Sequence, residues 1–408
     1  MKTLVLFVIL LSSVFAQSVN VLTGADLLFS DHFDLVKGKR LGVVTNHSAL
    51  LINKVHLIDS LFNSKDVKLT ALFGPEHGIR GDAPDGNTIK HGKDAKTGIP
   101  VYSLYGEIRK PTEEMLKDID ILIFDIQDVG ARFYTYISTL FYTLQAAAEN
   151  NIPVIVLDRP NPITGNKIDG PIRKDELTSF VGIAPIPIMH GLTIGELAIM
   201  FNESGLLGKN LKAELKTVNM KNWKRSYYFD ILNLNWVKPS PNIPDVETTI
   251  VYPGTCLIEG TNVSEGRGTQ SPFLTIGAPY INSEQLIAEL NKMGIDGVTL
   301  APVEFTPVDI KNMASKPKYE GVLCHGINIK VVNREKFEPV KFGVKLVSAI
   351  HSLFPQEFKF SDSRFDRLSG DKKIRESILA ERAPADIISD WQTELANFIE
   401  NRKQYLLY

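Results

Sequence analysis

The amino-acid sequence predicts an α/β fold whose first half contains a parallel sheet. Four short and almost wholly apolar runs have the length of buried strands: 40–46, 67–73, 119–125 and 152–158. Stretches with helical periodicity alternate with these runs, and the clearest is 134–150, between the third and the fourth. Apolar strands alternating with helices are typical of a parallel sheet that helices cover on both faces.

The residues just after these strands are the first place to look for a site. In open parallel sheets, ligands bind beyond the carboxyl ends of the strands. The pattern changes after the Pro- and Gly-rich stretch 159–171, and further α/β alternation then runs to a helical, charged tail. We therefore predict one domain over residues 17–170 and a second over 171–408.

The first sixteen residues have the features of a cleaved signal peptide. Lys2 supplies the positive charge, residues 4–11 form an unbroken apolar run, and Ala16 ends a cleavage site of small residues. Eight apolar residues are too few to span a bilayer, and the rest of the chain has no run of about eighteen. The sequence thus predicts an exported, periplasmic or secreted protein without an integral membrane span.

Composition and missing motifs exclude several classes of protein. The 45 Lys and Arg residues against 47 Asp and Glu leave no positive surplus for a generic nucleic-acid binder. The two cysteines, Cys256 and Cys324, could form one disulfide or remain thiols, but they cannot build a disulfide scaffold. The sequence has no dinucleotide, P-loop, serine-hydrolase or zincin motif, and no histidine pair with metal-binding spacing. A dinucleotide enzyme, a P-loop enzyme, an ordinary serine hydrolase and a zincin are therefore disfavoured, and we expect no metal.

The densest group of chemically active residues follows the second strand, at 74–82. Its glycines allow sharp turns, and Glu76, His77 and Arg80 project from it. A carboxyl group at such a rim can act as a general acid when partial burial favours its protonated form. The alternative is a structural loop in which Glu76 caps a helix or pairs with Arg80.

A second polar group follows the third strand. Asp125, Asp128, Arg132 and Tyr134 stand at the expected mouth of the sheet, where they suit a hydroxyl-rich, anionic ligand. The structural alternative is that Asp128 caps the next helix and Arg132 pairs with it. Polar candidates elsewhere stand after the first strand or in Gly- and Pro-shaped loops: Asn46, His190, Asn242, Glu265 and Arg267.

These segments resemble one known family. The chain is similar, over residues 22–408, to the exo-β-N-acetylmuramidases of bacterial cell-wall turnover, glycoside hydrolase family 171, long catalogued as a family of unknown function. The matching segments are Thr45-Asn46, Gly74–Gly78, Phe124–Tyr134, Asp158–Pro162, His190–Thr193, Pro239–Pro244 and Glu259–Thr269. One departure is Met189, which precedes His190 where many relatives have a basic residue.

The resemblance implies a fold and an activity. It implies a Rossmann-like first domain, a second α/β domain and an active-site cleft between them, without a cofactor. It also implies release of terminal N-acetylmuramic acid (MurNAc) from the non-reducing end of peptidoglycan fragments, such as muropeptides and MurNAc–GlcNAc disaccharides. The glutamate and histidine of the family's G-P-E-H-G motif correspond to Glu76 and His77, and a tyrosine role corresponds to Tyr134.

Glycoside hydrolysis assigns roles to these candidates. Glu76 is the expected general acid, and Asp125 or Asp128, with Tyr134 as an alternative, is the expected second catalytic group. The 2-acetamido group of the substrate could also act as nucleophile. Arg80, Arg132 or Arg267 could bind the lactyl carboxylate of muramic acid, because arginine pairs with carboxylates in a bidentate manner. Asn46, His77, His190, Asn242 and Glu265 are expected to contact substrate.

Two other functions fit the same sequence features. An exported two-lobed binding protein would capture a sugar or muropeptide without cleaving it. A hydrolase of a different cell-wall bond would also need an exported chain with polar loops. Turnover of a chromogenic N-acetylmuraminide distinguishes the muramidase from both.

Overall fold

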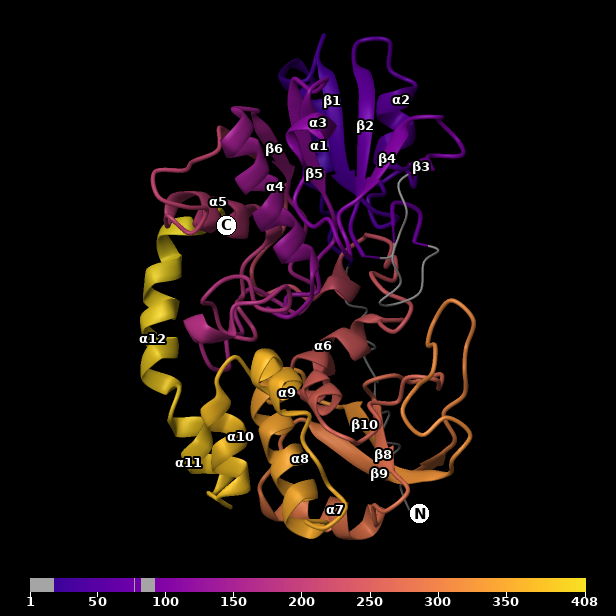
Figure 1. Ribbon diagram of the computed structural model, residues 1–408, viewed down its shortest axis with the longest axis vertical. Coiled ribbons are helices and arrows are strands. Elements are labelled where there is room, and N and C mark those ends of the chain that lie inside the picture. Colours follow the sequence, from indigo (N-terminus) through magenta and orange to yellow (C-terminus); the bar gives the residue numbers. More distant parts are fainter. Residues whose placement is uncertain (1–17, 77, 82–91) are drawn as a thin grey trace, which may run out of the picture.

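The computed structural model describes residues 18–76, 78–81 and 92–408, which form two sheet-containing regions stacked along the long axis (Figure 1). Within these residues the first sheet has seven strands in the order β3-β4-β2-β1-β5-β6-β7. The strands are β1 (Arg40–Thr45), β2 (Lys68–Gly74), β3 (Gly92–Lys93), β4 (Pro100–Ser103), β5 (Ile121–Asp125), β6 (Val154–Leu157) and β7 (Leu215–Val218). All neighbouring pairs are parallel except β3 and β4.

The order of the parallel strands is that of a Rossmann fold. Without the two-residue β3, the remaining six strands occur in the chain order 3-2-1-4-5-6. The direction of winding therefore reverses between β1 and β5, which is the switch point where such folds bind ligands. The predicted α/β class and the Rossmann-like sheet are confirmed.

Both faces of the sheet are buried, which explains the continuous apolar runs. In β1, Leu41 and Val43 pack on the face covered by α1 (Gly24–Ser30) and α2 (Leu57–Phe62). Val44 belongs to the core on the opposite face. Helices on that side are α3 (Glu113–Leu116), α4 (Tyr136–Asn150) and α5 (Ile194–Glu203).

The second region contains a smaller antiparallel sheet. Its described strands are β8 (Thr275–Ala278), β9 (Val298–Phe305) and β10 (Cys324–Val331), in the order β8-β10-β9. The helices here are α6 (Val246–Thr255), α7 (Ser283–Lys292), α8 (Pro339–Leu353), α9 (Asp362–Ser369), α10 (Lys372–Leu379) and α11 (Pro384–Ser389). Cys256 and Cys324 are both buried free thiols.

The chain crosses between the regions more than once. The predicted boundary near residue 170 lies within the part of the chain that builds the first sheet, because β7 pairs in parallel with β6. The last helix, α12 (Gln392–Asn401), then runs back from the second region to α5 (Figure 1). Beyond it, the Tyr408 hydroxyl donates to Asp158 Oδ2 at 2.7 Å. Among the described residues, no helix has the length and hydrophobicity needed to cross a membrane.

Helices α6 and α8 cross at glycine, and this contact gives a stability prediction. A Cβ added at Gly254 would lie 1.9 Å from the carbonyl oxygen of Pro339, a backbone atom that no side-chain rotation can move. We expect Gly254→Ala to lower the free energy of unfolding by about 2–3 kcal/mol, since the helices must separate. Chemical denaturation measures this change. Gly92→Ala is the control, because a Cβ at Gly92 meets no atom within 4 Å.

Candidate active site

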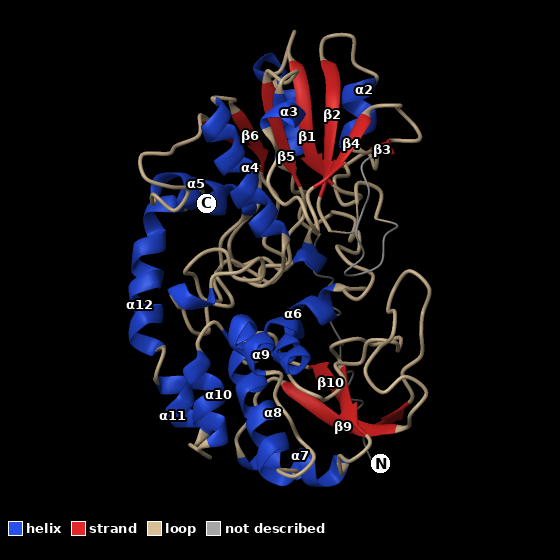
Figure 2. Cartoon of the chain, in the orientation of Figure 1, coloured by secondary structure: helices blue, strands red, loops and turns tan. Residues whose placement is uncertain are grey.

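The carboxyl ends of the first sheet point toward the second region (Figure 2). At the switch point, the Thr45 hydroxyl of β1 donates to the carbonyl oxygen of Asp125 at 2.9 Å. The Asn46 side-chain oxygen accepts from the Ser48 amide at 3.0 Å and from its hydroxyl at 2.5 Å. Ser48 Oγ in turn accepts from the Gln127 amide at 3.0 Å. The β1 and β5 loops are thus joined at this edge, while the wider cleft inferred from the sequence stays a prediction.

Glu76 stands two residues beyond the end of β2. Its side chain is half-buried, and Oε2 accepts a hydrogen bond of 2.9 Å from the Thr135 hydroxyl. Thr135 immediately precedes α4, so the loop after β5 orients the carboxyl group that follows β2. Tyr134 is buried with its ring edge-on to Tyr136, at 4.9 Å between centroids. The carboxyl group of Glu76 therefore lies beside the segment that leads from β5 into α4.

Asp128 and His190 form a buried pair in which the histidine is uncharged. His190 Nε2 lies 4.0 Å from Asp128 Oδ2, and Asp128 Oδ2 accepts from the Gly130 amide at 2.7 Å. Burial raises the pKa of Asp128 to about 7, against the opposing effect of backbone amides. Burial, together with the charges of nearby arginines, lowers the pKa of His190 to about 3. Near neutral pH, His190 is therefore neutral and Asp128 is partly protonated.

Asp125 has a structural partner. Its carboxylate oxygens lie 2.5 Å from Arg159 Nε and 2.9 Å from Arg159 Nη2, and its side chain is fully buried. Burial alone would lower the pKa of Arg159, but the Asp125 charge outweighs it and the pKa lies above the ordinary value. This ion pair links the ends of β5 and β6. The geometry does not support the expected catalytic role of Asp125, because Arg159 occupies its carboxylate.

Two of the three candidate arginines bind other groups of the protein. Arg132 is completely buried and donates to the carbonyl oxygens of Pro171, Ile186 and Leu368, so it supports the loop structure and cannot meet a substrate carboxylate. None of these three hydrogen bonds goes to Asp128, the partner that the structural alternative gave to Arg132. Arg80 donates twice to the buried Asp94, at 3.0 and 2.9 Å, and once to Asp59 at 3.4 Å. Two acidic partners leave no positive surplus at Arg80.

Arg267 lies in a charged cluster with Glu259 and Glu265. Its Nη2 donates to Glu259 at 2.9 Å, and its Nε lies 3.4 Å from Glu265. Among the described residues, Arg364 also binds Glu259 and Lys318 also binds Glu265. The pKa of Glu259 is held well below its ordinary value, because the arginine charges outweigh the effect of burial. Arg267 stays a candidate for the contact with the lactyl carboxylate.

A loop leading into α6 approaches the same edge. The His47 ring nitrogen Nε2 donates to the Lys238 carbonyl at 2.6 Å, and the Tyr136 hydroxyl donates to the Pro239 carbonyl at 2.5 Å. Asn242, which is buried, donates from Nδ2 to the Met313 carbonyl at 2.8 Å. Asn242 and Glu265 are therefore held in separate loops on the side of the second region. His77, the remaining candidate, lies outside the described residues.

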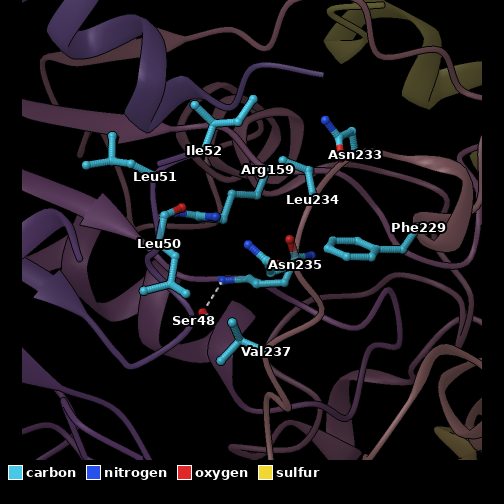
Figure 3. Close-up of a pocket in the computed structure, with 11 residues that line it drawn as sticks. Ser48, Leu50, Leu51, Ile52, Arg159, Phe229, Asn233, Leu234, Asn235 and Val237 are labelled. Carbon is cyan, nitrogen blue, oxygen red and sulfur yellow. Dashed lines mark hydrogen bonds between the residues drawn. The ribbon is translucent and has the colours of Figure 1, made fainter. Parts of the chain in front are cut away.

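A small cavity also opens at this edge (Figure 3). Its volume is about 30 Å³, and Ser48, Gln127 and Arg159 line it together with apolar and amide side chains from 50–52 and 229–237. That volume holds about one or two water molecules and not a sugar ring. The cavity therefore lies beside Arg159, the partner of Asp125, and is too small to be the substrate site.

Sequence reasoning missed several residues that orient the site. Thr135 and Arg159 belong to segments that the motifs had identified, but nothing in the pattern assigned Thr135 to Glu76 or Arg159 to Asp125. Lys318 and Arg364 come from segments without any motif. Their partners stand 53 and 105 residues away in the chain, so only the tertiary fold reveals these contacts.

Comparison with known proteins covers most of the described chain. The family model "Exo-beta-N-acetylmuramidase NamZ, N-terminal" matches residues 41–247, and the corresponding C-terminal model matches residues 250–408. The division between the two models falls after β7, in agreement with the extent of the first sheet. A curated relative, the peptidoglycan β-N-acetylmuramidase NamZ of Bacillus subtilis strain 168, is 50% identical over 96% of this chain and 92% of its own length.

Two solved structures share the fold. Both are DUF1343 family proteins from Bacteroides fragilis NCTC 9343. The first is 36% identical with a TM-score of 0.87, covering 96% of this chain and 99% of its own. The second is 34% identical with a TM-score of 0.77, covering 95% and 99% respectively.

Proposed function

Because the chain belongs to the exo-β-N-acetylmuramidase NamZ family, we propose that it removes terminal N-acetylmuramic acid from peptidoglycan by hydrolysis. It is a glycosidase, and its similarity to the Bacillus subtilis muramidase extends over nearly the full length of both chains. The observation that carries the proposal is the position of Glu76 beside Thr135, in a sheet edge that the family models cover. MurNAc–GlcNAc disaccharides and muropeptides are the fragments that we expect as substrates.

The geometry supports Glu76 as the general acid. Glycosidic cleavage needs a group that protonates the leaving oxygen and a second group that stabilises or attacks the oxocarbenium-like centre. The Thr135 hydroxyl donates to Oε2 of Glu76, which orients the carboxyl group from one side. With Asp125 bound to Arg159, the candidates for the second group are Asp128, Tyr134 and the substrate's own 2-acetamido group.

Turnover of a chromogenic N-acetylmuraminide tests the proposal. The wild-type protein should release the phenolate and should also convert MurNAc–GlcNAc to its two sugars. Binding of these compounds without turnover would favour a two-lobed binding protein. Release of other products from peptidoglycan, with the muraminide left intact, would favour hydrolysis of a different cell-wall bond.

Export is a further part of the proposal. The charged Lys2, the apolar run 4–11 and the small residues before Ala16 predict a signal peptide, and all of these positions lie outside the described residues. We expect the mature protein to begin near Gln17 and to be periplasmic or secreted. Intact-mass measurement of the exported protein checks this. A retained Met1, or recovery in the membrane fraction, would contradict it.

A further inference from the structure

Three buried side chains at the switch point each have one polar atom without a hydrogen-bond partner among the described residues. These atoms are Asn46 Nδ2, Asp128 Oδ1 and His190 Nε2. Asn46 and His190 are 0% exposed and Asp128 is 6% exposed. An unpaired polar atom in the interior opposes folding. Three of them beside the ligand-binding edge of the sheet therefore point to a role other than stability.

Each of these side chains is held in place through its other polar atom. Asn46 Oδ1 accepts from Ser48, and Asp128 Oδ2 accepts from the Gly130 amide. His190 Nδ1 accepts from the Leu192 amide at 3.2 Å. The side chains are thus fixed by backbone or neighbouring donors while the second polar atom stays available. This is how binding residues are oriented before a ligand arrives.

The three groups also lie close together. Asn46 follows β1 and Asp128 follows β5, and these strands are neighbours with Thr45 opposite Asp125. Ser48 joins them, because it bonds to Asn46 and accepts from the amide of Gln127, the residue before Asp128. His190 lies 4.0 Å from Asp128. The atoms are buried, so only a small group inserted between these loops could pair with them.

The chemistry of the three atoms fits a neutral amide. Asn46 Nδ2 is a donor, and His190 carries its proton on Nε2 because Nδ1 accepts from Leu192. Asp128 Oδ1 accepts when ionised and can donate when protonated. An amide carbonyl needs donors and an amide N–H needs an acceptor. An anion would gain no hydrogen bond from His190 in a charged form or from Arg132, since His190 is neutral and Arg132 donates to carbonyl oxygens.

We propose that Asn46, Asp128 and His190 bind the 2-acetamido group of the muramic sugar and thereby determine specificity for N-acetylated substrates. The inference rests on the proposed muramidase function. It assigns Asp128 to substrate positioning and leaves charge recognition to the Arg267 cluster. The leaving N-acetylglucosamine also carries an acetamido group, so the experiment must separate the two sugars.

A substrate comparison tests the assignment. A p-nitrophenyl N-acetylmuraminide has only the muramic acetamido group, and its de-N-acetylated counterpart lacks it. The wild-type protein should prefer the acetylated compound in kcat/KM. Asn46→Asp, which keeps the oxygen bound to Ser48, and His190→Asn, which removes Nε2–H, should each reduce this preference at least about tenfold. Preservation of the preference in both variants would overturn the inference.

Asn202→Asp is the matched control. Asn202 is also a buried asparagine, but both of its polar atoms pair with Ala213, so this change should lower thermal stability and leave the preference unchanged. MurNAc–glucosamine, compared with MurNAc–GlcNAc, tests the leaving sugar. If Asn46→Asp abolishes discrimination between these disaccharides and not between the muraminides, the muramic assignment is wrong.

Binding measurements separate this inference from the proposed function. Calorimetry with N-acetylmuramic acid and with muramic acid requires no turnover. Preferential binding of the acetylated sugar that is lost in His190→Asn supports the inference even if wild-type protein hydrolyses neither muraminide. Equal affinities of wild-type protein for the two sugars would refute it, whatever the activity.

Discussion

Glu76→Gln should reduce hydrolysis of the natural disaccharide by about 10²–10⁴-fold, because glutamine cannot transfer a proton to the leaving oxygen. The glutamine side chain keeps the size of glutamate and can still accept from the Thr135 hydroxyl, so the fold should be retained. Steady-state kinetics on MurNAc–GlcNAc measures the effect. The loss should fall mainly on kcat, since the group acts in the transition state.

The leaving group distinguishes acid catalysis from a binding role. A p-nitrophenolate leaves without much protonation, so Glu76→Gln should affect the chromogenic muraminide less than the disaccharide. A binding role would affect both substrates equally. Near wild-type hydrolysis of the disaccharide by a folded Glu76→Gln variant would pass the acid role to Asp128. Asp125→Asn is the comparison variant, and it should mainly reduce thermal stability by disturbing the pair with Arg159.

Sequence reasoning located the strands around the site because burial on both faces leaves a strong apolar signal. The four predicted strands correspond to β1, β2, β5 and β6 with ends that differ by at most two residues. The edge strand β7 has the residues Leu215–Val218, and only Val218 is fully buried. Its pattern is too short and too polar to identify as a strand. For this reason the sequence predicts that the first region ends near residue 170.

The sequence predicts where the candidate residues stand on the sheet better than it predicts their partners. The rule that ligands bind at the carboxyl ends of parallel strands selects Asn46, Glu76 and Asp128, which follow β1, β2 and β5 in the structure. It could not separate Asp128 from Asp125, which stands three residues earlier on the same strand end. That distinction depends on Arg159, whose approach requires β6 to lie beside β5. Arg132 was likewise indistinguishable from a substrate-binding arginine until its carbonyl partners were known.

Recognition of the lactyl carboxylate should depend on Arg267. It lies in a loop of the second region with its side chain 23% exposed, whereas Arg132 is completely buried. A buried charge pair that loses one partner costs roughly 2–5 kcal/mol, equivalent to about 30- to 4,000-fold in kcat/KM. Arg267→Ala should therefore lower kcat/KM for a muraminide by this factor. It should lower kcat/KM for an N-acetylglucosaminide, which lacks the lactyl group, much less.

The cluster itself should survive the Arg267→Ala substitution. Glu259 keeps Arg364 and Glu265 keeps Lys318, so neither carboxylate is left without a cation. Arg364→Ala is the matched control, because Arg364 is the other arginine that pairs with Glu259. Its side chain is 58% exposed. An equal selective loss in both variants would mean that the net charge of the cluster, and not a contact with Arg267, attracts the substrate. Equal losses on muraminide and glucosaminide in Arg267→Ala, with wild-type behaviour of Arg80→Ala, would remove the arginine–lactyl contact from the mechanism.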